Sequence, residues 1–108
     1  MIVVDTSALL AVFLEEREGP RCAAVLRSTE RLPISAGTLA EALIVSGRRG
    51  VGPSVAAFIV ARPIEVVPVN AATAERMAGS YARWGKGVHP AGLNLGDCFA
   101  YALAEEMG

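Results

Sequence analysis

Three acidic residues stand near the starts of expected helices, each among largely apolar neighbours. Asp5 directly follows the apolar run at residues 1–4, Glu41 lies in TLAEALIV, and Asp97 lies in NLGDCFAYAL. Each also has a purely structural explanation. Asp5 can act as an N-cap, and the spacings Thr38-x-x-Glu41 and Asn94-x-x-Asp97 match the capping box. Taken singly, capping accounts for Glu41 and Asp97. For Asp5 two explanations remain open, a helix cap and a functional position at the carboxyl end of a strand.

Taken together, the three acids predict a site for a divalent cation. In a parallel α/β sheet, residues that follow the strands meet at one rim, where ligands gather. Two carboxylates about 4 Å apart repel by about 4 kcal/mol at an effective dielectric constant of about 20. Such a cluster must take up protons or hold a cation, and no Lys or Arg is adjacent in sequence to any of the three. Oxygen ligands of this kind suit Mg²⁺ or Mn²⁺.

Two hydroxyl-bearing residues directly follow the first acid. A cation at the rim can activate water and neutralise the charge that develops on a phosphodiester. Thr6 and Ser7 lie beside Asp5 in sequence, where they can orient a water or a phosphate oxygen. Capping of a helix over residues 8–16 is the structural alternative for both hydroxyls, and the two roles can coexist.

Basic and aromatic residues gather in two expected loops, which suggests contacts to a nucleic acid. These residues are Arg48, Arg49, Tyr81, Arg83, Trp84, Lys86 and His89. Phosphates pair with basic side chains and unpaired bases stack on aromatic rings, so the pattern suits single-stranded RNA, and a solvated surface loop is the alternative. For His89 we expect a surface position or a phosphate contact, because no Ser or Cys partner for nucleophilic catalysis is evident.

The order of the expected elements predicts an α/β domain. Strands are expected at residues 1–4, 32–35 and 64–69, and helices at 8–16, 20–28, 38–46, from Pro53 onward, from Asn70 to about Trp84, and at 95–107. Alternation of strands with helices favours a parallel sheet with right-handed crossovers. Pro68 places the strand at 64–69 near an edge of the sheet.

Composition limits the class of protein. At 108 residues the chain is one domain, and 53% apolar residues with a mean hydropathy of +0.43 favour elements that are covered on both faces. Ten basic residues against 11 acidic ones leave the molecule without the net positive charge that attracts a polyanion. A nucleic acid must therefore bind to a local basic patch. Cys22 and Cys98 form no metal motif and are expected as buried thiols. With no signal peptide or membrane span expected, we predict a soluble cytoplasmic protein.

Three segments, IVVDTSALLAVFLEE, SAGTLAEALIV and HPAGLNLGDCFAYALAEEMG, resemble the PIN-domain ribonucleases, in particular the VapC toxins of type II toxin–antitoxin systems. The resemblance covers nearly the whole chain. It implies one PIN-like domain over residues 1–108, built as a three-layer α/β/α sandwich with a central parallel sheet. It also implies a Mg²⁺- or Mn²⁺-dependent endoribonuclease, a VapB-like antitoxin that blocks the site, and a homodimer.

The resemblance also implies roles for individual residues. Asp5 and Asp97 are expected to bind the metal, and Glu41 either binds it or positions the attacking water. Thr6 and Ser7 are the expected polar support. The substrate-binding residues that we expect from the basic loops are Arg48, Arg49, Arg83 and Lys86.

One departure from the family pattern leaves alternatives open. Family members usually continue past the final helix into another strand and a further acid, whereas this sequence ends at Gly108. We therefore expect a C-terminally truncated domain without that last strand. One alternative is a catalytically inactive domain that only binds an antitoxin. Another is a phosphatase-like hydrolase with an aspartyl nucleophile, which is disfavoured because position 7 is Ser and no catalytic Lys motif is evident.

Overall fold

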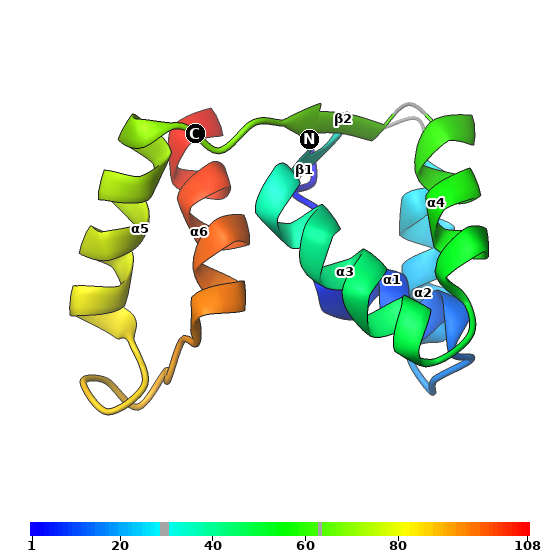
Figure 1. Cartoon of the computed structure of the whole chain (residues 1–108), viewed down its shortest axis with the longest axis horizontal. Coiled ribbons are helices and arrows are strands. Elements are labelled where there is room, and N and C mark those ends of the chain that lie inside the picture. The colour runs from blue at the N-terminus through cyan, green and yellow to red at the C-terminus, as the bar shows by residue number, and fades with distance from the viewer. Residues whose placement is uncertain (29–30, 63) are drawn as a thin grey trace.

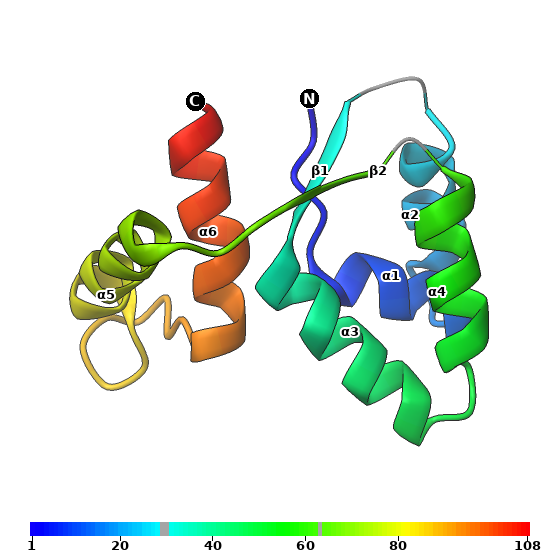
Figure 2. The same cartoon turned by 45° about the horizontal axis from the view of Figure 1, so that its top comes forward.

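The helices and strands form three layers, as the sequence predicts. The computed structural model describes residues 1–28, 31–62 and 64–108. The elements are α1 (Thr6–Phe13), α2 (Gly19–Leu26), β1 (Leu32–Ser35), α3 (Ala36–Arg48), α4 (Gly52–Ala61), β2 (Ile64–Val67), α5 (Ala71–Trp84) and α6 (Leu95–Met107). The strands lie between the antiparallel pair α5 and α6 on one side and helices α1 to α4 on the other (Figures 1 and 2).

The sheet is short and parallel. β1 pairs with β2 in the register Leu32↔Ile64 to Ser35↔Val67. The expected strand at residues 64–69 ends at Val67, immediately before Pro68, whose backbone nitrogen has no hydrogen to donate. Within the described residues β2 pairs with β1 alone, so it lies at an edge of the sheet, as Pro68 predicts.

The expected strand at residues 1–4 forms only in part. The backbone N–H groups of Ile2 and Val4 donate to carbonyl oxygens of residues 31 and 33, each at 2.9 Å. Val4 forms an isolated parallel bridge with Ile34, so this extended segment flanks β1 on the side away from β2. The bridge still delivers Asp5 to the carboxyl end of the sheet, next to the start of α1.

Two helices start earlier than predicted because other residues cap them, and the helices expected at residues 8–16 and 20–28 end at Phe13 and Leu26. Asp5 itself caps α1, which starts at Thr6, so neither Thr6 nor Ser7 is the cap. Ser35 caps α3, with its side chain accepting a hydrogen bond from the Gly37 N–H, so this helix starts before Thr38. It also continues past Gly47 to Arg48. The packing of a buried helix face overrides the weak local tendency of one glycine to end a helix.

Apolar side chains fill both sides of the sheet. The larger cluster is centred on Leu9, Leu32 and Ile34, and a smaller cluster between α5 and α6 contains Met77 and Cys98. Burial raises the pKa of the Cys98 thiol, and the charge of Asp97 raises it further. Cys98 is a buried free thiol as expected, whereas Cys22 is only partly buried. No helix among the described residues is long and apolar enough to cross a bilayer.

The cap of α5 allows a simple test of this part of the fold. Asn70 accepts a hydrogen bond from the Thr73 N–H at 3.0 Å, and the Thr73 hydroxyl accepts one from the Asn70 N–H at 3.3 Å. We expect Asn70→Ala to lower the free energy of unfolding by about 1 kcal/mol in urea denaturation, because an N-cap is lost. Asn70→Asp, which keeps a capping oxygen, should match the wild type. Equal stability of all three proteins would contradict this account of the cap.

Candidate active site

Asp5 serves as a helix cap and still faces the rim of the sheet. Its Oδ1 accepts hydrogen bonds from the Ala8 N–H at 2.9 Å and from the Ser7 hydroxyl at 2.7 Å. Its Oδ2 accepts no hydrogen bond from the described part of the chain, and the side chain is exposed. The structure therefore confirms the cap, which uses one oxygen of Asp5, and a functional role for the other oxygen stays a prediction.

Glu41 takes no part in the expected capping box. Because Ser35 caps α3, the Thr38 hydroxyl is buried without a hydrogen-bond partner among the described residues. The Glu41 Oε1 instead accepts a hydrogen bond from the Thr6 hydroxyl at 2.6 Å. Its Oε2 lies directly over Gly96, where any Cβ atom would overlap the carboxylate. The half-buried Glu41 side chain is therefore held between α1 and the start of α6.

Asp97 completes a capping box, as its spacing predicts. The Asp97 Oδ2 accepts a hydrogen bond from the Asn94 N–H at 3.1 Å, and the Asn94 Oδ1 accepts one from the Asp97 N–H at 2.9 Å. Over the part of the chain that the structure covers, the Asp97 Oδ1 has no hydrogen-bond donor. The capping role thus leaves one carboxylate oxygen available.

All three acids line one pocket, although they come from three distant parts of the chain. The pocket has a volume of about 700 Å³ and lies between α1, α3 and α6. Thr6 and Ser7 also line it, and none of the described lining residues is Lys, Arg or His. The ion pairs found in the described ranges join Arg21 to Glu18 and Arg31 to Glu65, so none neutralises the pocket.

The donor set of this pocket fits a hard divalent cation, but the ligand shell is not assembled. Asp5 and Asp97 each keep one oxygen without a hydrogen bond, and all the available donors are oxygens, which Mg²⁺ and Mn²⁺ prefer. Within residues 1–28, 31–62 and 64–108, no three Asp, Glu, His or Cys side chains stand close enough to hold an ion. Metal binding by these acids therefore stays a prediction.

The structure separates the basic residues that the sequence proposes for substrate contact. Arg48 and Arg49 are exposed at the end of α3 and lie outside the acidic pocket. Because α3 continues past Gly47, Arg48 and Glu41 belong to the same helix. The seven residues between their positions correspond to about 10 Å along the helix axis, so Arg48 lies far from Glu41.

The second basic group lies in the last turn of α5, which carries Arg83, and in the loop that leads to α6. Lys86 lines a groove that shares Asn94 with the acidic pocket. Arg83 lines a smaller cavity and lies 6.0 Å from the Trp84 ring centroid. His89 is exposed, as expected, and its Nδ1 accepts a hydrogen bond from the Ala91 N–H at 2.9 Å. Lys86 thus lines a groove that shares Asn94 with the acidic pocket, and Arg83 lines a cavity that shares Tyr101 with it.

Gly96 and Tyr101 stand out among the pocket residues that the sequence analysis did not name as site residues. Gly96 supports the Glu41 carboxylate, and Tyr101 lines the pocket one helical turn after Asp97. The spacing of four residues between Asp97 and Tyr101 is a usable signal, because such residues share a helix face. For Gly96 the local sequence carries no signal, since its contact is to a residue 55 positions away.

The chain matches known proteins over almost its full length. Residues 2–108 match the family described as PIN domain. Ribonuclease VapC30 of Mycobacterium tuberculosis is 36% identical, over 99% of this chain and 84% of the relative. Ribonuclease VapC of Mycolicibacterium smegmatis is 36% identical, over 99% of this chain and 85% of the relative.

A solved structure supports the fold independently of close sequence similarity. Mycobacterium tuberculosis VapC20, described as a Sarcin-Ricin loop cleaving toxin, is similar with a TM-score of 0.80 at 18% identity. The match covers 100% of this chain and 84% of that chain. At this level of identity, the likeness supports the three-layer architecture.

Proposed function

Because this chain belongs to the PIN-domain family, we propose that it is a VapC-type endoribonuclease that hydrolyses RNA phosphodiester bonds with the help of Mg²⁺ or Mn²⁺. The observation that carries the proposal is the pocket that Asp5, Glu41 and Asp97 share without any basic residue among its described lining. Relatives that are 36% identical over nearly the whole chain bear the name ribonuclease.

The charge of the pocket supports a bound cation. Three carboxylates face one space, and nothing in the described lining offsets them. Asp5 and Asp97 would hold the ion through the oxygens that capping leaves unused. When bound, a divalent ion supplies Lewis-acid stabilisation of a phosphate's developing charge and lowers the proton affinity of water.

The side chains around the acids have definable tasks. The Thr6 hydroxyl donates to Glu41 Oε1, which fixes the carboxylate and leaves Oε2 either to bind the ion or to accept a proton from water. The Ser7 hydroxyl orients Asp5 by donating to its Oδ1. The hydrogen bond from Thr6 joins α1 to α3, so it ties Glu41 to the helix that Asp5 caps.

The proposal extends to partners. A VapB-like antitoxin would block the acidic pocket, the chain would form a homodimer, and its action on RNA would be in the cytoplasm. The names of the relatives, which are VapC ribonucleases, support the antitoxin and the RNA substrate.

A cleavage assay tests the proposed activity directly. The purified chain is incubated with end-labelled single-stranded RNA, and with DNA of the same sequence, in the presence of Mg²⁺ or Mn²⁺. We expect fragments from RNA and none from DNA. Intact RNA after long incubation with both metals would overturn the proposal, and antitoxin binding under the same conditions would then favour the catalytically inactive alternative.

The contact between Gly96 and Glu41 gives a second test. A methyl group at position 96 would overlap the Glu41 carboxylate and displace it. We expect Gly96→Ala to lower the rate of RNA cleavage by roughly 10- to 100-fold, a typical effect of disturbed positioning around a metal. The matched control is Gly47→Ala, where the added Cβ meets nothing within 4 Å. Equal cleavage rates for the two folded variants would contradict the assigned role of Glu41.

A further inference from the structure

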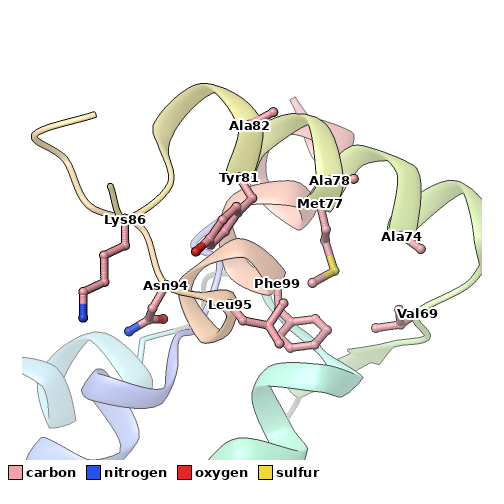
Figure 3. A pocket seen from close by; sticks show the side chains of 10 residues that line it. All are labelled: Val69, Ala74, Met77, Ala78, Tyr81, Ala82, Lys86, Asn94, Leu95 and Phe99. Atoms are coloured by element: carbon pink, nitrogen blue, oxygen red, sulfur yellow. The ribbon is translucent and has the colours of Figure 1, made fainter. Parts of the chain in front are cut away.

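An apolar groove adjoins the acidic pocket across the start of α6. The groove has a volume of about 810 Å³ and lies between α5 and α6 (Figure 3). Met77 and Tyr81 of α5 line one wall, and Leu95 and Phe99 of α6 line the other. The catalytic roles proposed above use none of these side chains, so the groove needs an explanation of its own.

The groove opens at the same rim of the sheet as the acids. Val69, which lines it, follows the carboxyl end of β2. The Phe99 ring packs on the backbone of Gly37 in the first turn of α3, so closely that any Cβ atom at Gly37 would overlap the ring. The next turn of α3 carries Glu41. One helix therefore supports both the groove and the acidic pocket.

The polar groups of the groove are gathered at the end next to the acids. Lys86 and Asn94 lie beside each other there, and the Tyr81 hydroxyl points toward them (Figure 3). Met77, Phe99 and Val69 occupy the other end. Among the lining residues that the structure describes, Lys86 alone carries a charge, and Asn94 also lines the acidic pocket. The groove thus has a cationic end and a flat apolar end.

We propose that this groove binds the nucleotide next to the phosphodiester that is cleaved in single-stranded RNA. Its base lies against Tyr81 and Phe99, because unpaired bases stack on aromatic side chains. Its phosphate meets Lys86, which is of opposite charge. Asn94 lines both the groove and the acidic pocket, so the two are adjacent. An apolar protein segment would match the apolar end but not the cationic end. This inference rests on the proposed nuclease function.

Equilibrium binding tests the groove without requiring cleavage. An RNA oligonucleotide with a fluorescent label is titrated with the chain carrying Asp5→Asn in Mg²⁺, and its anisotropy is followed. We expect the further change Tyr81→Ala to raise Kd about tenfold, the loss of one stacked base, whereas Tyr81→Phe keeps the ring and the affinity. Equal Kd values for the Ala and Phe variants would overturn the proposal and leave the groove to a protein segment or a second copy of the chain.

An abasic scan identifies the base that occupies the groove. A series of oligonucleotides carries one abasic residue at successive positions. With Tyr81 present, an abasic residue at one position should raise Kd about tenfold. In the Tyr81→Ala protein, the same abasic residue should raise Kd little further, because the stacking partner of the base is already gone. Equal penalties with and without the Tyr81 ring at every position would contradict a base in the groove.

Salt dependence tests the phosphate contact. Lys86→Ala should reduce the slope of log Kd against log salt by about 0.7, the value for one phosphate on a single strand, and Lys86→Arg should preserve it. An unchanged slope in Lys86→Ala would overturn the contact. The two proposals can fail separately. If the wild type does not cleave RNA but the abasic penalty depends on the Tyr81 ring, the nuclease proposal is wrong and the groove proposal holds. If RNA is cleaved but the abasic penalty is the same with and without the ring, the groove proposal is wrong.

Discussion

Asp5→Asn is expected to abolish RNA cleavage while the protein stays folded. Asp5 caps α1 through its Oδ1 and lines the acidic pocket, and its Oδ2 accepts no hydrogen bond from the described residues. Asn caps a helix as well as Asp does, so stability should change by less than about 0.5 kcal/mol. The loss of charge removes a proposed metal ligand. Because a catalytic metal contributes several kcal/mol, we expect a fall of about a thousandfold in the cleavage rate.

Two further variants separate the charge of Asp5 from its cap. Asp5→Ala loses both, so it should lose activity and also about 1 kcal/mol of stability. Glu106→Gln removes an exposed carboxylate of α6 that lies outside the acidic pocket, and its activity should equal that of the wild type. Cleavage rates and urea denaturation are measured on the same preparations. An active Asp5→Asn protein would show that this carboxylate is a helix cap and nothing more.

Chelation of divalent cations is expected to stop cleavage completely. The pocket holds three carboxylates with no basic residue in its described lining, so none of those lining groups can supply the positive charge of the ion. We expect EDTA to lower the cleavage rate about a thousandfold or more. Excess Mg²⁺ or Mn²⁺ should restore it. The ion should also stabilise the fold, by about 2.7 kcal/mol at a concentration of 100 times its Kd.

The chelation experiment needs a control for contaminating nucleases. The Asp5→Asn protein, purified in the same way, reports the background rate. Its melting temperature should respond to Mn²⁺ less than that of the wild type. Cleavage by the wild type that persists unchanged in EDTA above this background would exclude a metal-dependent mechanism.

Local signals made much of this architecture predictable. β1 was expected at the residues where it lies, because a short apolar run between turn signals is typical of a buried strand. The capping box at Asn94 and Asp97 was expected from its spacing, since a cap depends on residues within one helical turn. The prediction of an α/β domain with a parallel sheet follows from such elements in their order along the chain, whereas its three layers are what the resemblance to the PIN-domain ribonucleases implies.

Contacts between distant segments were not predictable in this way. The spacing of Thr38 and Glu41 gave a capping box as the structural alternative for Glu41, yet its hydroxyl partner is Thr6, 35 residues earlier. The support that Gly96 gives to Glu41 depends equally on how α6 packs against α3. The helix expected at residues 38–46 continues through Gly47 to Arg48, because its buried face packs along that length. In each case tertiary packing decided between local alternatives.

A crystal soaked in Mn²⁺ tests the central claim, that the three acids hold one divalent cation between them, most directly. The anomalous difference map locates the metal independently of any activity. The account predicts a peak in the acidic pocket, with carboxylate oxygens of Asp5 and Asp97 at bonding distance and Glu41 bound directly or through water. A map without a peak there, with the acids ordered and the pocket open to the soak, would contradict it.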